Sequence, residues 1–134
     1  MADQFAGTER REFVRLEYSV PVGFKVCKKE TISKLLSGYT SDISQAGLLC
    51  RVKEKVNKDD ILWLCFDRST LEFCQELEKR VLIYQNGIIG KVARIEPKDD
   101  TFDIGVKFIT REESNSTFIY PKVHFLFKEL EGQG

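Results

Sequence analysis

Apolar and polar residues alternate along most of the chain, with the period of two that is typical of β-strands. The clearest run begins at Leu16 and continues to Val26, so that one face is apolar and the other polar. Pro21 lies on the polar side and cannot donate a backbone hydrogen bond, which predicts a bulge or a sheet edge near the middle of this strand. A second extended segment covers about 37–44, and a third follows Gly47.

Further strands are expected in the second half of the chain. Residues 61–66 are apolar on both faces, which predicts a central strand that is buried on both sides. Gln85-Asn86-Gly87 separates two β-like runs, and Asn-Gly between such runs is a strong hairpin signal. Because 102–108 alternates again, the last three strands are expected to form a meander. The stretch from Arg68 to Lys79 fits neither period and is left unassigned.

The last segment changes period. Its apolar residues are spaced by four, three and four positions, as on one face of a helix: Ile119, Val123, Leu126 and Leu130. The pattern therefore predicts a mainly β fold, a six- to seven-stranded antiparallel β-barrel with a C-terminal α-helix over an open end or a partner's surface. We expect one domain over 10–134, with the barrel at about 16–109, the helix at about 111–131 and a flexible tail at 1–9.

Composition limits the classes of function. The chain has 134 residues, and its 21 basic and 21 acidic residues balance. A formal charge of zero argues against a protein that binds long DNA or RNA by neutralising many phosphates, although a small anionic ligand in a local basic pocket is compatible with it. No segment approaches the roughly 20 apolar residues that a membrane span needs. The start of the chain lacks a secretory signal, so we expect a cytoplasmic protein.

The residues that usually carry metal or redox chemistry are scattered. None of the four cysteines forms a Cys-x-x-Cys pair, and they lie in apolar segments: Cys27, Cys50, Cys65 and Cys74. His124, the only histidine, falls in the expected helix, where we interpret it as a surface residue. The cysteines are therefore expected to be small core residues. No metal, no cofactor and no catalytic residue is predicted, so the chain is not expected to be an enzyme.

Two short polar motifs supply candidate ligand chemistry. The first is Arg11-x-x-x-Arg15, preceded by Arg10. Guanidinium groups make bidentate bonds to phosphate oxygens and to the O6 and N7 atoms of guanine. Residues four apart lie on the same side of either a strand or a helix, so both arginines can reach one ligand. Alone, this spacing is common on solvated surfaces.

The second motif is Asp42-x-Ser44-x-x-Gly47. On a strand, Asp42 and Ser44 would lie on the outer face around the inward Ile43. Asp42 can accept hydrogen bonds from guanine N1 and N2, and Ser44 can bind a phosphate or a base edge. Gly47 would permit a left-handed turn or a close backbone approach. Taken alone, the motif is better explained by turn residues that bond local backbone.

The two motifs, complete and in this order, resemble those of the PilZ domain family. Gly90-Lys91-Val92-Ala93-Arg94 and Gly105-Val106-Lys107-Phe108 also resemble the later strands of that family, and the resemblance covers roughly residues 10–109. It implies a receptor for cyclic di-GMP, a bis-guanylate with two phosphates. Six residues would then bind the nucleotide: Arg10, Arg11, Arg15, Asp42, Ser44 and Gly47. Arg10 could help to hold a second ligand molecule.

The resemblance also implies how a signal would leave the domain. A segment at about 8–13 would wrap the ligand, and the signal would pass to an unidentified downstream protein, from a monomer or a homodimer. Motility or exopolysaccharide control are family-level possibilities. The alternative is a PilZ-like protein-interaction module that does not bind nucleotide. A third hypothesis, an OB-type nucleic-acid-binding barrel, fits less well, because the charge is balanced and the aromatic residues lie mainly at core positions.

Overall fold

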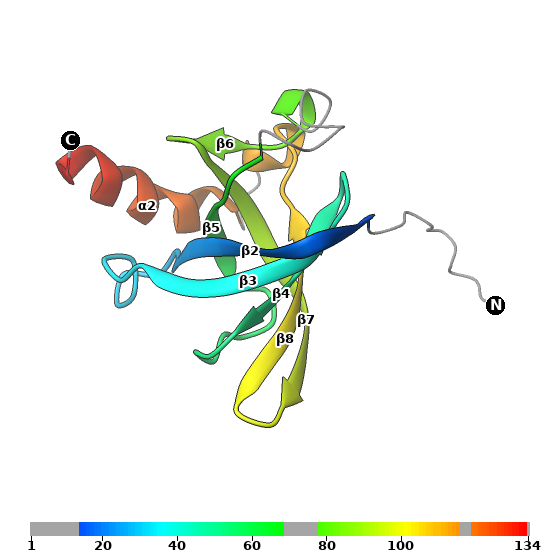
Figure 1. Ribbon diagram of the computed structural model, residues 1–134. Coiled ribbons are helices and arrows are strands. Elements are labelled where there is room, and N and C mark those ends of the chain that lie inside the picture. Colours follow the sequence, from blue (N-terminus) through cyan, green and yellow to red (C-terminus); the bar gives the residue numbers. More distant parts are fainter. Residues whose placement is uncertain (1–13, 69–77, 116–118, 134) are drawn as a thin grey trace.

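The computed structural model describes residues 14–68, 78–115 and 119–133. The expected tail at 1–9 and most of the unassigned stretch from Arg68 to Lys79 lie outside these residues. Within the described residues, seven strands precede a C-terminal helix (Figure 1). The strands are β2 (Val14–Val26), β3 (Leu36–Ile43), β4 (Gly47–Val52), β5 (Ile61–Cys65), β6 (Ile83–Tyr84), β7 (Gly87–Lys98) and β8 (Thr101–Phe108).

The strands form one antiparallel sheet that closes on itself. Their order is β5-β2-β3-β4-β8-β7-β6, and β5 also pairs with β7. This additional pairing closes six strands into a barrel, and β6 is added outside it on β7. The expected β-barrel with a C-terminal helix is confirmed, as is the meander of the last three strands. Closure satisfies the backbone hydrogen bonds that an open sheet would leave at its edges.

The first strand shows how the alternating pattern produces the barrel. Val22, Phe24 and Val26 point into the core, and each is almost fully buried. Among the described residues, strand β2 pairs with β5 only over Gly23–Val26, so Pro21 lies in a part of β2 whose described partner is β3 alone. The register with β3 shifts between Arg15 and Val20. An irregular strand with a free edge near Pro21 is therefore confirmed.

The hairpin between β6 and β7 forms where Asn-Gly predicts it, but one residue earlier. Gln85 and Asn86 are the two turn residues, with φ of 47° and 68°. Gly87 instead begins β7, and a Cβ atom there would lie 2.2 Å from Nε1 of Trp63. Gly87 is therefore required by the contact with the indole, whose N–H donates to the carbonyl of Tyr84 at 2.7 Å.

Strand β5 is buried on both faces, as predicted, because it separates two hydrophobic clusters. Leu62 and Leu64 belong to the barrel interior. Ile61 and Trp63 point the other way, into a cluster with Ile89 of β7 and the apolar stripe of the helix. That stripe consists of Ile119, Val123, Leu126 and Leu130.

The C-terminal helix α2 runs from Ile119 to Gln133. The expectation of a helix from about 111 was too early, since Glu112–Asn115 form the short 3-10 helix η1. Pro121 lies in the first turn of α2, where its missing N–H costs no helical hydrogen bond. The helix covers the outer wall at β5 and β7, which corrects the expectation of an open end. It does so because β5 and β7 carry apolar residues on their outer faces.

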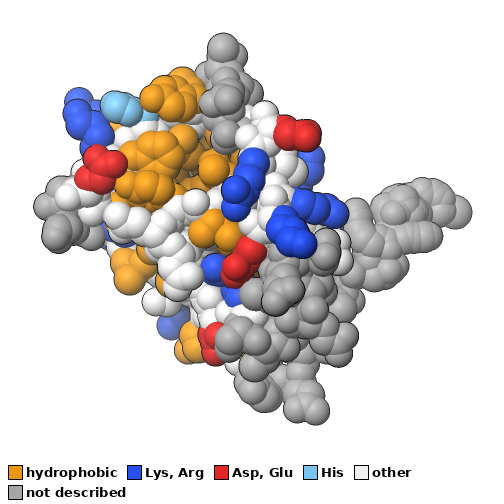
Figure 2. All heavy atoms as spheres, turned by 90° about the horizontal axis from the view of Figure 1, so that it is seen from above, with side chains coloured by type: hydrophobic (Ala, Val, Ile, Leu, Met, Phe, Trp, Pro, Cys, Tyr) orange, Lys and Arg blue, Asp and Glu red, His pale blue; other side chains and the backbone are white. Residues whose placement is uncertain are grey.

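The outer flank of α2 carries exposed aromatic residues. Figure 2 shows hydrophobic side chains gathered on the side of the molecule where α2 lies. The ring of Tyr84 lies 4.4 Å from that of Phe127, and the Tyr84 hydroxyl donates to Glu131 at 3.1 Å. His124 is exposed, as expected for a helix-surface residue. None of the described helices is long and apolar enough to cross a membrane.

The cysteines that the structure describes fit the prediction of core residues. Cys27 and Cys50 are buried and Cys65 is half-buried, each as a free thiol, while Cys74 lies outside the described residues. Burial disfavours the thiolate and raises the pKa of Cys27 and Cys50 to about 12. Both thiols are therefore protonated over the physiological pH range.

This burial predicts slow thiol chemistry. At pH 8 in the native state, Cys27 and Cys50 are expected to remain unmodified by iodoacetamide, since the reactive thiolate is scarce at a pKa of about 12. Peptide mass spectrometry with and without urea gives the measurement. Both sites should be alkylated once the chain unfolds, and rapid labelling of either site in the native protein would contradict the prediction.

Candidate ligand-binding face

A β-bulge in β3 turns Asp42 to the outside of the barrel. Thr40 pairs with Cys50 and Asp42 pairs with Leu49, so Ser41 is an extra residue on β3. Without the extra residue, strict alternation would place Asp42 on the same inner face as Thr40. The bulge instead places Asp42 half-exposed on the outer face and returns Ile43, which is 1% exposed, to the core.

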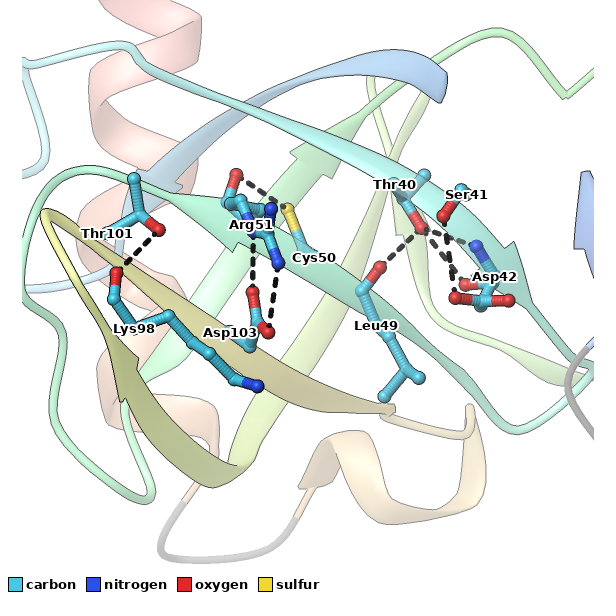
Figure 3. Close-up of polar contacts among 9 residues, drawn as sticks. All are labelled: Thr40, Ser41, Asp42, Leu49, Cys50, Arg51, Lys98, Thr101 and Asp103. Atoms are coloured by element: carbon cyan, nitrogen blue, oxygen red, sulfur yellow. Dashed lines mark hydrogen bonds and ion pairs between the residues drawn. The ribbon is translucent and has the colours of Figure 1, made fainter. Parts of the chain in front are cut away.

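The buried hydroxyl of Thr40 holds this bulge (Figure 3). The single O–H of Thr40 is shared between the carbonyls of Leu49 and Asp42, and its Oγ1 atom accepts the backbone N–H of Asp42 at 3.3 Å. Thr40 is only 2% exposed, so water does not replace these bonds easily. The bulge is therefore a specified feature of the strand, and it fixes the position of Asp42.

A second bulge on β7 has the same effect on Arg94. Val92 pairs with Val106 and Arg94 pairs with Gly105, so Ala93 is the extra residue. Val92 is buried, Ala93 and Arg94 are both exposed, and Ile95 packs against the barrel core again. Alternation alone would point the guanidinium of Arg94 into the core, where an unpaired charge is costly.

The two bulges bring residues from five strands into one row across the outer wall. The register pairs Arg15 with Asp42, Asp42 with Leu49, Leu49 with Gly105, and Gly105 with Arg94. Residues at such opposed positions lie on the same face of a sheet, with neighbouring Cβ atoms about 5 Å apart. The row therefore places a carboxylate, an apolar residue and a glycine between two arginine positions.

A second row runs beside the first. Tyr39 pairs with Arg51, Arg51 with Asp103, and Asp103 with Glu96. A cavity of about 620 Å³ lies over both rows, a volume within the range of small-molecule sites. The cavity is lined by Ser19, Tyr39, Ser41, Asp42, Leu49, Cys50, Arg51, Arg94, Glu96, Asp103 and Ile104.

Gly105 leaves the middle of the first row without a side chain. A Cβ atom there would lie 3.7 Å from the side chains of Arg94 and Leu49, which is ordinary contact, and its φ is not positive. Packing and backbone conformation therefore do not demand a glycine at this position. What Gly105 provides is a flat area between Leu49 and Arg94 on which a planar base could lie.

Ser44 and Gly47 build the turn that follows Asp42. The Ser44 hydroxyl accepts the N–H groups of Ala46 and Gly47 at 3.1 and 3.2 Å and donates to the Gly47 carbonyl at 3.3 Å. A Cβ atom on Gly47 would lie 1.9 Å from the carbonyl oxygen of Val106. Gly47 is thus needed for the close approach of β4 to β8, and its φ is not left-handed.

Charged pairs shape the cavity wall. Arg51 binds Asp103 through two hydrogen bonds, of 2.8 and 3.3 Å. The hydrogen bond from Arg51 lowers the pKa of Asp103 below its ordinary value. Among the described residues, no group of three or more His, Cys, Asp and Glu side chains is arranged to bind a metal ion.

The structure brings together some of the residues that the sequence singles out. Asp42 lines the cavity, and the backbone of Arg15 lies directly across from it. Arg10 and Arg11 lie outside the described residues. Arg94, which is not among the six ligand residues that the resemblance implies, also lines the cavity. The sequence feature that indicates the outward position of Arg94 is the break in alternation at Ala93. A search for motifs does not detect this break.

Comparison with known proteins assigns the chain to a family. The family model of the PilZ domain matches residues 9–119. The chain belongs to the PilZ domain family. None of the curated proteins shows a significant match to the sequence. The match covers both the arginine motif and the strands that carry Asp42 and Arg94.

Solved structures resemble this PilZ domain at low sequence identity. The inhibitor of motility MotI/DgrA of Bacillus subtilis is 15% identical with a TM-score of 0.50, and the likeness covers 92% of this chain but 51% of that one. The PilZ domain therefore spans about half the length of MotI/DgrA. The PilZ domain with c-di-GMP of YcgR from Escherichia coli is 11% identical (TM-score 0.42; 92% and 93% covered). The PilZ domain of CeSA from a cellulose-synthesizing bacterium is 16% identical (TM-score 0.38; 88% and 98% covered). At these identities, the likeness to MotI/DgrA shows the fold alone.

Because the Thr40 hydroxyl holds the bulge of this PilZ domain, its removal should lower stability markedly. Thr40→Val keeps the shape but leaves the buried Asp42 N–H and Leu49 carbonyl without the hydroxyl. We expect the free energy of unfolding to fall by about 1–3 kcal/mol. Urea denaturation gives the measurement. Thr101→Val is the matched control, because the Thr101 hydroxyl bonds the Lys98 carbonyl in an exposed turn and should change stability by less than about 0.5 kcal/mol. Equal effects of the two variants would contradict the role of Thr40.

Proposed function

We propose that this PilZ domain is a receptor for cyclic di-GMP, and that the outer-face row from Arg15 to Arg94 is its binding site. The observation that carries the proposal is the position of Asp42. A bulge holds this carboxylate at the cavity, between an arginine position on β2 and the exposed Arg94 on β7. A dianionic bis-guanylate needs both a guanine acceptor and phosphate donors, and the row has both.

Each residue of the row has a role that follows from its chemistry. Asp42 accepts the N1 and N2 hydrogens of one guanine, a pair of donors that adenine lacks. Arg15 and Arg94 bind phosphate oxygens or the O6 and N7 atoms of guanine. Leu49 and Gly105 form the flat surface beneath the base. This set explains why the row contains charge at its ends and apolar area at its centre.

The arginine motif completes the proposed site from outside the described residues. We assign Arg11 to phosphate or guanine and Arg10 to a second ligand molecule, so that the segment 8–13 closes over the nucleotide. The free energy of ordering this segment would come from its charge-assisted bonds. Ser44 and Gly47, expected from the motif as ligand contacts, are better supported as residues that fix the turn beside Asp42.

The proposed output is an interaction with another protein. Closure of 8–13 over the ligand would change the surface next to β2 and β3, and a downstream protein would recognise that change. Regulation of motility or of exopolysaccharide production is compatible with this output. Catalysis has no part in the proposal, because binding and closure are sufficient for a receptor.

Isothermal titration with cyclic di-GMP tests the receptor function. The wild-type chain should give saturable binding, and Asp42→Ala and Arg11→Ala should each weaken it by at least about tenfold, as expected for a lost charge-assisted bond. Cyclic di-AMP should bind much more weakly, because adenine lacks the paired N1 and N2 donors that guanine offers to Asp42. The stoichiometry reports whether one or two nucleotides bind.

Two control variants separate the site from general charge effects. Arg80→Ala and Asp100→Ala remove exposed charges that lie outside the cavity lining, so binding should be unchanged. If the folded wild type gives no binding, the receptor function is wrong and the alternative, a PilZ module that binds protein but no nucleotide, is favoured.

The surface under the base gives a second test. Gly105→Val adds a side chain where there is room for its Cβ, so the fold should tolerate the substitution. The added methyl groups would occupy the surface on which the base is proposed to lie. We expect at least about tenfold weaker binding with little change in thermal stability. Gly23→Val is the matched control, because Gly23 is also a strand glycine with room for a Cβ but lies away from the cavity lining. Unchanged affinity in Gly105→Val would place the base elsewhere.

A further inference from the structure

Two charged residues of the cavity wall, Arg51 and Asp103, form an ion pair with each other. Arg51 on β4 and Asp103 on β8 are directly opposed in the register, and Figure 3 shows their side chains facing each other. The Arg51 Nε and Nη2 atoms donate to the two carboxylate oxygens at 2.8 and 3.3 Å. The Arg51 side chain is 60% exposed and that of Asp103 is 34% exposed, so neither is locked in the core.

The charges of the cavity make this pair relevant to an anionic ligand. The described lining residues include two cations, Arg51 and Arg94, and three anions, Asp42, Glu96 and Asp103. Asp103 neutralises one of the two cations. The part of the wall that the structure describes is therefore poor in positive charge available to a ligand with two phosphates.

Arg51 can make the same pair of bonds to a phosphate as to a carboxylate. A guanidinium fork matches both groups in its geometry, and Arg51 is on the second row, next to the row that is proposed to hold the nucleotide. Because the arginine is exposed, its head can turn away from Asp103 without disturbing the barrel core. Asp103 would then be stabilised by water.

We propose that Asp103 limits the affinity of the site by holding Arg51, and that a ligand phosphate takes the Arg51 guanidinium over from Asp103. This inference rests on the proposed function, since it names a further contact of the same cyclic di-GMP site. Asp103 is then an affinity-setting residue: the ligand must break an existing ion pair before it gains a phosphate contact.

A double-mutant cycle on cyclic di-GMP binding tests the exchange. Asp103→Asn should tighten binding by about fivefold, which corresponds to about 1 kcal/mol, the upper end for an exposed ion pair. Arg51→Ala should weaken binding by a similar factor or more. In the double variant, the gain from Asp103→Asn should largely disappear, because no guanidinium is left to release. Isothermal titration at constant salt measures all four proteins.

Glu96→Gln supplies the matched control for charge alone. Glu96 is directly opposed to Asp103 on β7 and lines the same cavity, so its neutralisation removes a negative charge without releasing Arg51. Its effect on binding should be smaller than that of Asp103→Asn, and it should be the same in the presence and absence of Arg51.

The outcomes separate this inference from the receptor function. If the wild type binds but Asp103→Asn has equal effects with and without Arg51, Asp103 acts only through its charge and the exchange is wrong. Unchanged affinity in Arg51→Ala would also overturn it. Tighter binding by Asp103→Asn that is lost again when Arg51→Ala is added would support the exchange. Absence of binding in every variant would overturn both the exchange and the receptor function.

Discussion

The site depends on a constraint that closure of the barrel imposes. Every second residue of a barrel strand must point inward, and an uninterrupted β3 or β7 would direct Asp42 or Arg94 toward the core. A single extra residue in each strand turns the charged side chain that follows it outward, and the next apolar side chain then points into the interior. The core keeps its packing while the outer wall gains a carboxylate and a guanidinium on one row. Without the two bulges, either the core would contain charged side chains or the outer wall would lack this carboxylate and guanidinium.

The glycines show how one residue type serves different physical needs in this fold. Gly47 and Gly87 are required by close contacts, the first with the Val106 carbonyl and the second with the Trp63 indole. Gly105 has room for a side chain, so that its lack of one matters to the surface and not to the fold. The same distinction divides the polar motif on β3: Asp42 faces the cavity, while the Ser44 hydroxyl is engaged by the backbone of the turn.

The local sequence pattern was sufficient to predict the strands and the helix, but it was insufficient to predict how these elements contact one another. Alternation located the strands, the spacing of four and three located α2, and Asn86-Gly87 located the hairpin to within one residue. The motifs directed attention to Asp42. The sequence did not reveal that Arg94 joins the same row, because that depends on the register of β7 with β8 and on the bulge at Ala93. The place of α2 on the outer wall likewise depends on which strands close the barrel, and this is a non-local property.

The charge of the cavity supports the proposal that the arginine motif takes part in binding. The described wall has more acidic than basic lining residues, and one of its two arginines is paired with Asp103. A dianionic nucleotide would be repelled by such a wall in isolation. The positive charge that the wall lacks has to come from elsewhere in the chain, and the cluster of Arg10, Arg11 and Arg15 immediately precedes or begins the strand next to Asp42. In the proposed receptor, affinity would depend on how these arginines meet the wall, so that ligand binding and closure of the segment 8–13 would be one event. A receptor with a fully basic, preformed pocket would bind without such a change and would have no signal to transmit.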